Sequence, residues 1–169
     1  MIKGTEEGLS KGTGGGMSGL VAFSLDDRRF AVPLSAVKRV ERIAAVTLLP
    51  KAPAIVAGII NFHGQVIAVM DIRSRFNLPS REPELNDHLL IMETGRRTLA
   101  FIVDGADGVI DASTDQYADT GTVLSGTEYV KGVVKLEDGM VLIHDPETFL
   151  SLEEEHALEA VMKEVQTET

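Results

Sequence analysis

The amino-acid sequence predicts a mainly β protein made of two related halves. Short apolar stretches alternate with turn-forming residues along most of the chain, which is typical of hairpin strands. The stretch 58–76 recurs in weaker form at 132–150, and the pattern of 28–40 recurs at 97–109. The offsets are 74 and 69 residues, and the two blocks keep the same order. Because hairpins resemble one another by chance, it is the ordered recurrence of both blocks that favours an internal duplication.

The first half opens with a predicted hairpin whose strands cover 20–25 and 29–33, on either side of an Asp-Asp-Arg turn. After it, Ser35 can cap a short helical turn, because its hydroxyl accepts a hydrogen bond from a free backbone N–H. Val37 and Val40 lie three residues apart, which is the spacing of one helical face. We therefore expect a short helical turn in this segment.

The stretch 58–76 is predicted to form the second hairpin of the first half. Its turn is expected at His63–Gly64, between two apolar strands. The second strand ends in a polar exit that contains Asp71 and Arg73. A polar loop, 77–87, then joins the two halves.

The second half repeats this order of hairpins. Its first hairpin turns at 95–97, and its closing hairpin turns at 137–139. Its predicted strands, in order, are 89–92, 99–103, 109–110, 130–136 and 140–143.

The two ends of the chain differ in character from the rest. Residues 1–19 contain seven glycines and little that can be buried, so we expect a flexible tail. Ser151 and Glu154 form a capping box that opens a helix over 151–166, after the body of the protein at 20–150. One face of that helix is apolar and either packs back on the body or docks a partner. Its residues are Leu158, Val161, Met162 and Val165.

The composition excludes several classes of function. The formal net charge is −10, half of it in 151–169, which disfavours nucleic-acid binding because such binding needs a basic face. The chain has no Cys, so thiol catalysis and disulfides are excluded. No apolar run reaches the roughly 20 residues that span a bilayer, and no signal peptide is evident. We expect a soluble cytoplasmic protein.

The histidines and aspartates offer no catalytic or metal-binding constellation. None of the four His has the spacing of a metal site, and we expect His144 at a tolerated strand position and His156 in solvent. Asp71, Asp104 and Asp145 each follow an apolar strand, where a carboxylate can be a general base, a metal ligand or a cap. Their recurrence in the duplicated pattern favours a shared structural role.

The arginines admit two interpretations. Arg73 and Arg75 could bind an anionic ligand, but such side chains more often form surface ion pairs of little energetic worth. The Arg96–Arg97 pair in the hairpin turn is interpreted in the same way. The sequence therefore predicts a binding protein rather than an enzyme. A small hydrolase that uses Asp71 or His63 is the alternative from another class.

At this point the residues resemble a known family. Gly58-x-x-Asn61-Phe-His-Gly64, followed by Asp71-Ile-Arg73 and Phe76, resembles the hallmark G-x-x-N-L-R-G-x-x-x-P-[IV]-x-D-L-R-x-x-F of CheW-like coupling proteins. The resemblance extends over roughly 19–160. Further matches are Val103-Asp104 with Val109, Tyr129-Val-x-Gly132-Val133, Leu136, Asp138-Gly139 and Leu142-Ile-x-Asp145.

The resemblance implies a fold of two SH3-like, five-stranded β-barrel lobes packed together, with short helices and a C-terminal helix. It implies no catalysis, metal or cofactor. Such proteins couple the cytoplasmic tips of chemoreceptors to the regulatory domain of a CheA-type histidine kinase, in arrays at the membrane. By position, Ala57, Gly58 and Gly64 resemble the kinase-facing residues, and Val37, Arg39 and His63 the receptor-facing ones. The structural motif positions are Asn61, Asp71, Arg73, Asp104, Gly132 and Asp145.

Three departures from the family pattern stand out. His63 replaces an Arg, Phe62 a Leu and Ala68 a Pro. An Arg carries a permanent charge and a planar fork of donors, whereas a His is mostly neutral at pH 7. These changes bear on partner contacts rather than on the fold. The changes at His63 and Ala68 motivate an alternative, a CheW-like adaptor of a non-chemotaxis pathway such as pilus motility or gene regulation.

Overall fold

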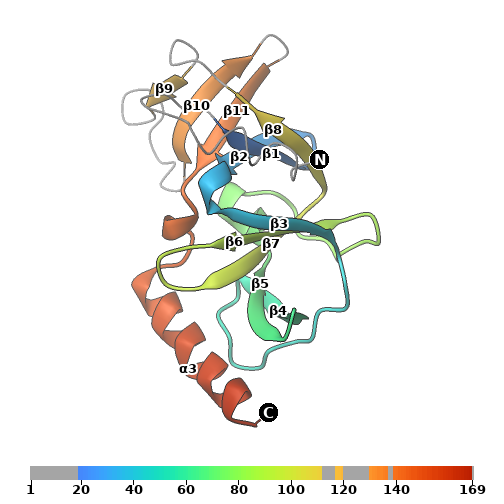
Figure 1. Cartoon of the computed structure of the whole chain (residues 1–169), viewed down its shortest axis with the longest axis vertical. Coiled ribbons are helices and arrows are strands. Elements are labelled where there is room, and N and C mark those ends of the chain that lie inside the picture. The colour runs from blue at the N-terminus through green and yellow to red at the C-terminus, as the bar shows by residue number, and fades with distance from the viewer. Residues whose placement is uncertain (1–18, 112–116, 120–129, 137–138, 169) are drawn as a thin grey trace.

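The computed structural model describes residues 19–111, 117–119, 130–136 and 139–168, with some side chains at the edges of these ranges left aside. Two β-sheets lie one above the other, and a long helix runs along one side of the lower sheet (Figure 1). The prediction of a mainly β fold with a C-terminal helix is confirmed. The predicted turn at 137–139 lies partly, and the tail at 1–19 almost wholly, outside the described residues.

Sheet A has the strand order β8-β1-β2-β11-β10-β9, and sheet B has the order β3-β6-β7-β5-β4. The strands of sheet A are β1 (Leu20–Leu25), β2 (Arg28–Pro33), β8 (Gly105–Ile110), β9 (Tyr117–Asp119), β10 (Val130–Leu136) and β11 (Gly139–His144). Those of sheet B are β3 (Val37–Arg42), β4 (Val56–Phe62), β5 (Gln65–Met70), β6 (His88–Glu93) and β7 (Thr98–Val103). Short 3₁₀ turns are η1 (Leu34–Ala36), η2 (Ile72–Phe76) and η4 (Pro146–Thr148), and the helix is α3 (Leu152–Glu168).

The two halves of the duplication do not coincide with the two sheets. Sheet B is contiguous in sequence, from β3 to β7, and is inserted between β2 and β8 of sheet A. The chain therefore crosses between the sheets at 34–36 and again at Asp104, not at the 77–87 loop, which connects two strands of sheet B. The hairpin β1–β2 belongs to the first half of the sequence but lies in a sheet with β8, β10 and β11 of the second half. Contacts between residues distant in sequence therefore decide which strands pair.

The duplication itself is visible in the strand boundaries. Strands β10 and β11 begin and end 74 residues after β4 and β5. Each pair also carries an irregularity at the matching place, between Val56 and Gly58 and between Val130 and Gly132. A bulge of this kind bends a strand and raises its twist, which a small closed sheet requires.

The main hydrophobic core lies between the two sheets. Its buried members come from both, including Phe23 and Phe30 of sheet A and Leu90 and Phe101 of sheet B. Two smaller clusters lie within sheet B and within sheet A. Because the largest cluster draws on both sheets, each sheet buries an apolar face against the other.

Helix α3 closes one side of this core. Leu158 and Met162 are buried, and Val161 and Val165 pack against the same cluster, so the predicted apolar face packs back on the body. The predicted capping box is present: the Ser151 N–H donates to Glu154 Oε1 at 2.9 Å and the Glu154 N–H to Ser151 Oγ at 3.1 Å. Among the described residues, no helix is long and apolar enough to cross a membrane.

Two local predictions are wrong. The short helical turn ends at Ala36, is preceded by Pro33 and has no side-chain cap from Ser35, while Val37 and Val40 lie in β3. Pairing with β6 favours the extended form, which β-branched residues prefer. His144 is not at a tolerated surface position but is fully buried. Its ring lies 4.4–6.4 Å from the rings of Phe23, Phe30, Phe76 and Phe149.

The shared core predicts that both sheets unfold together. Phe101 is fully buried and packs edge-on against Phe149 at 4.7 Å. Phe101→Ala should lower the free energy of unfolding by about 3–5 kcal/mol, because it leaves a cavity where both sheets meet. Urea unfolding should show one transition. The amides of β1 and of β6 should lose their protection from exchange over the same range of urea concentration.

Leu48→Ala is the control, because this side chain is 79% exposed, and it should change the free energy of unfolding by less than about 0.5 kcal/mol. Separate transitions for the two sheets would contradict the shared core.

Candidate partner-binding surface and its support

The turn of the β4–β5 hairpin lies at the end of β4, which is an edge strand of sheet B. His63 and Gly64 both have positive φ, 52° and 85°, as a two-residue turn matched to the strand twist requires. The Gly64 N–H donates to Asn61 Oδ1 at 2.8 Å. Asn61, His63 and Gly64 are exposed. The predicted turn at His63–Gly64 is confirmed, and Asn61 holds it closed.

Gly58 is required by a close approach of two backbone segments. Thr47 and Ile59 exchange backbone hydrogen bonds of 2.9 and 2.8 Å beside it. A Cβ added at Gly58 would lie 2.2 Å from the Thr47 carbonyl oxygen, a distance that no real side chain tolerates. The β4 edge is thus partly covered by Thr47, and the role of Gly58 is to permit that cover.

The predicted contact residues fall on the two edge strands of sheet B and the turn after β4. Gly58 is buried and Ala57 is half-buried against the sheet B cluster, so of the kinase-facing set Gly64 is the exposed member. The receptor-facing set includes Val37, half-buried against the shared core, and Arg39. The exposed Arg39 forms an ion pair of 2.9 Å with Glu41. Among the described residues no hydrogen bond or ion pair joins Arg39 to His63.

The Phe62 side chain supports the turn by packing against His63, a role that the sequence pattern did not reveal. Its ring meets the His63 imidazole edge-on, with centroids 4.4 Å apart and an interplanar angle of 82°. Phe62 is half-buried against the sheet B cluster. An aromatic residue next to a polar turn was the available signal, because such a ring can lie over its neighbour.

Asp71 and Asp145 have the capping role that their recurrence predicts. Asp71 Oδ1 accepts from the Arg73 N–H at 3.1 Å, and Asp145 Oδ1 accepts from the Glu147 N–H at 3.0 Å. Asp71 and His63 lie at opposite ends of β5, about 25 Å apart along an extended chain. Nothing in this geometry supports the hydrolase alternative. Within the described ranges, no group of three His, Asp or Glu could hold a metal ion.

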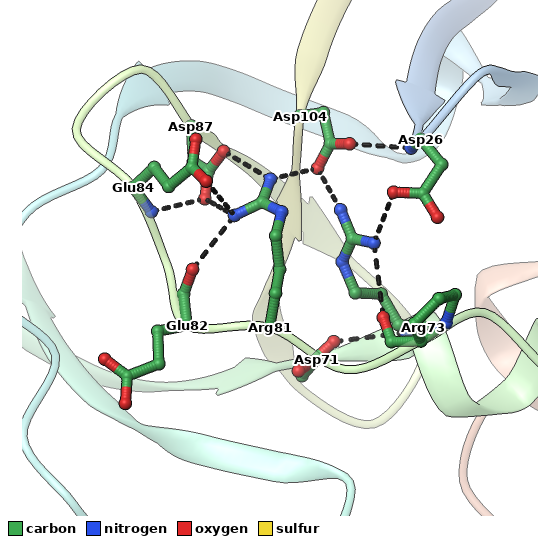
Figure 2. A network of polar contacts seen from close by, with 9 residues as sticks. Asp26, Asp71, Arg73, Arg81, Glu82, Glu84, Asp87 and Asp104 are labelled. Atoms are coloured by element: carbon green, nitrogen blue, oxygen red, sulfur yellow. Dashed lines mark hydrogen bonds and ion pairs between the residues drawn. The ribbon is translucent and has the colours of Figure 1, made fainter.

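Arg73 is not a surface residue but the buried centre of an ion-pair network (Figure 2). It is only 5% exposed. Its guanidinium donates to Asp26 at 2.8 Å and to Asp104. Asp104 also accepts from the Asp26 N–H at 2.6 Å. The expectation of a weak surface ion pair is therefore wrong for Arg73, because its guanidinium is buried. Removing either carboxylate partner would leave part of a buried charge uncompensated, which is costly.

Arg81 extends the network into the loop 77–87. It donates to both carboxylate oxygens of Asp87, at 2.9 and 3.0 Å, and to Asp104. Figure 2 shows Arg73 and Arg81 side by side below Asp104. Asp26 belongs to the β1–β2 turn and Asp104 to the crossing from β7 to β8, so the network joins sheet A, the crossing and the loop. The contact could not be read from the sequence, because its members come from four separate segments.

The charges of the network decide how Asp87 ionises. Burial of the Asp87 carboxyl disfavours its charged form, but the hydrogen bonds from Arg81 and from the Glu84 N–H outweigh that effect. The pKa of Asp87 therefore lies below its ordinary value. The pKa of Arg73 is raised although burial opposes it, because Asp26 and Asp104 stabilise its charge.

Two further arginines fasten helix α3 to the body. Arg75 pairs with Glu154 and also donates to the Phe149 carbonyl oxygen at 3.1 Å. Arg97 pairs with Glu155 at 3.1 Å. These side chains are mostly buried, in contrast to Arg96, which is exposed as predicted. The acidic start of α3 therefore serves as an attachment to the sheets as well as a solvated face.

Comparisons with known proteins agree on one family. A family model described as a CheW-like domain matches residues 19–154. The chemotaxis protein CheW of Rhizobium meliloti (strain 1021) is 27% identical over 147 residues, 86% of this chain and 94% of the relative. That of Treponema pallidum (strain Nichols) is 28% identical over 141 residues, 80% and 83% of the two chains. The crystal structure of the scaffolding protein TtCheW from Thermoanaerobacter tengcongensis matches with a TM-score of 0.74 and 25% identity, over 81% of this chain and 94% of that one.

The network predicts an acid dependence of stability. The pKa of Asp87 is lowered on folding, so its contribution to stability is present well above pH 3.8, the ordinary pKa of an Asp, and is lost progressively as the pH falls through that value and then through the lower pKa of the folded state. Arg81→Gln should lower the free energy of unfolding at pH 7 by about 2 kcal/mol, because charge-assisted bonds to a buried carboxylate are lost. The variant should also show a shallower loss of stability between about pH 5 and pH 2.

Urea unfolding across that pH range measures both effects. Arg96→Gln is the matched control, because it removes an exposed arginine that lies outside the network. The two variants should differ most at neutral pH and converge in acid. Coincident stability curves for both would show that the network contributes nothing to folding.

Proposed function

The chain belongs to the CheW-like domain family, and from that membership we propose that it is a non-catalytic adaptor that couples chemoreceptors to a CheA-type histidine kinase in bacterial chemotaxis. The family match over 19–154 carries this conclusion. The likeness of the whole fold to a scaffolding protein supports it. An adaptor needs surfaces rather than a reactive pocket, and the acids that resembled catalytic groups are engaged in caps and ion pairs.

We propose that the edges of sheet B carry the two partner surfaces. The regulatory domain of the kinase would contact the β4–β5 edge, where Gly64 is exposed and where Ala57 and Gly58 shape the strand. The cytoplasmic tip of a receptor would contact the surface that includes Arg39 and His63. Edge strands and exposed turns are surfaces that protein partners commonly use. The adaptor would thus act at the cytoplasmic side of the membrane, where receptor tips lie.

Binding to both partners tests this function. The full chain is titrated with the cognate kinase regulatory domain and, separately, with a fragment of the receptor tip, by calorimetry. We expect binding to each, and a ternary complex of all three on gel filtration. A folded chain that binds neither fragment would refute the coupling function. Binding to the kinase but to no receptor tip would leave the chain a kinase ligand rather than a coupler.

His63 predicts a contact that depends on its side chain. An Arg carries a permanent charge and a planar fork of donors that an imidazole lacks. His63→Arg should therefore raise the affinity for an acidic receptor-tip surface several-fold at about pH 7, which calorimetry measures. His156→Arg, at an exposed site on α3, is the matched control and should change the affinity by less than about twofold. An unchanged affinity in His63→Arg would place His63 outside the interface.

A further inference from the structure

We infer that Asn61 is a positioning residue, which fixes the turn so that His63 is presented to the receptor tip in one orientation. The inference rests on the proposed function and adds a residue that would act without touching the partner. It is carried by one hydrogen bond, two backbone angles and one ring contact within the same hairpin turn. Each of these can be removed separately.

The backbone of the turn needs the Asn61 side chain. Asn61 pairs with Val66 and Phe62 with Gln65, so His63 and Gly64 form the two-residue turn between the strands. His63 has a φ of 52°, a conformation that L residues adopt rarely, although His does so more readily than most. The bond from the Gly64 N–H to Asn61 Oδ1, 2.8 Å long, favours this conformation over others. Without it the turn would sample several conformations.

Phe62 adds a second restraint, on the imidazole itself. The Phe62 ring is anchored against the sheet B cluster and lies edge-on to the His63 ring at 4.4 Å. The backbone angle and the ring contact together fix the direction in which the imidazole points. A Cβ built on Gly64 would meet nothing within 4 Å, so no described residue crowds the turn there, and both His63 and Gly64 are exposed. The turn therefore holds the imidazole in a restrained orientation at an exposed site.

A group held in its bound orientation before contact loses less freedom on binding, and affinity gains accordingly. Asn61→Ala leaves the His63 side chain unchanged, but the turn that carries it should become more mobile. We expect the receptor-tip affinity to fall about three- to tenfold. This is the size of effect expected when one ordinary hydrogen bond that holds the turn in its bound conformation is lost. Asn86→Ala, at an exposed Asn in the loop 77–87, is the matched control and should change the affinity by less than about twofold.

Amide hydrogen exchange reads the turn directly. The Gly64 N–H should be protected in the wild-type chain, exposed to exchange in Asn61→Ala and protected again in Asn61→Asp, whose carboxylate can still accept the bond. The amides of β6 should keep their protection in all three, which would show that the body remains folded. Equal exchange at Gly64 in wild type and Asn61→Ala would overturn the inference.

A double-mutant cycle with His63→Asn decides whether Asn61 acts through His63. Asn tolerates positive φ, so this change removes the imidazole while keeping the turn. In the His63→Asn background, Asn61→Ala should change receptor-tip affinity by less than about twofold. An equal loss in both backgrounds, or no loss on His63→Asn alone, would overturn the inference and leave the coupling function standing. A wild-type chain that binds neither receptor tip nor kinase domain would overturn the coupling function itself.

Discussion

The apolar layer between the two sheets is the constraint on which the rest of the structure depends. Each sheet alone encloses only a small cluster, and the largest cluster forms where their outer faces meet. Sheets of this size gain little stability by themselves. Sheet B is inserted between β2 and β8, so the chain leaves sheet A after β2 and must re-enter it at β8, which keeps the two sheets in contact. The orientation of the two sheets is thus set by packing and not by a linker.

The ion-pair network stabilises the segment at Asp104, where the chain crosses from sheet B back to sheet A. The chain leaves sheet B at Asp104, which accepts from both Arg73 and Arg81 while its backbone N–H donates to the Ser24 carbonyl oxygen at 2.9 Å. A buried ion pair is not in itself a large source of stability, because desolvation offsets the attraction. Its effect is on specificity, because a crossing placed away from Arg73 would take Asp104 from this buried guanidinium. The arginine that resembles a family signature therefore has an architectural reason to be there.

The sequence predicted features that short-range chemistry decides and missed those that long-range contacts decide. The His63–Gly64 turn, the Ser151 capping box and the Asp71 cap each depend on residues within three positions of one another. Arg73 was misjudged because its partner Asp104 lies 31 positions away. The same reason applies to His144, whose aromatic neighbours come from other elements, and to the assignment of the two halves to two lobes. Periodicity identifies strands but not which strands pair.

Within the candidate site, structural and contact roles separate along the same hairpin. Gly58 is fixed by the Thr47 carbonyl oxygen, and Asn61 by the Gly64 N–H, so substitution at either would disturb the backbone. His63 is exposed, and its only described support is the ring of Phe62. A change at His63 to a residue that tolerates positive φ therefore costs the fold little while it alters the group that a partner meets. The chain thus keeps the glycines, Asn61 and Asp71 of the family pattern, and of its three departures His63 is the one that is exposed, whereas Phe62 is half-buried and Ala68 is buried.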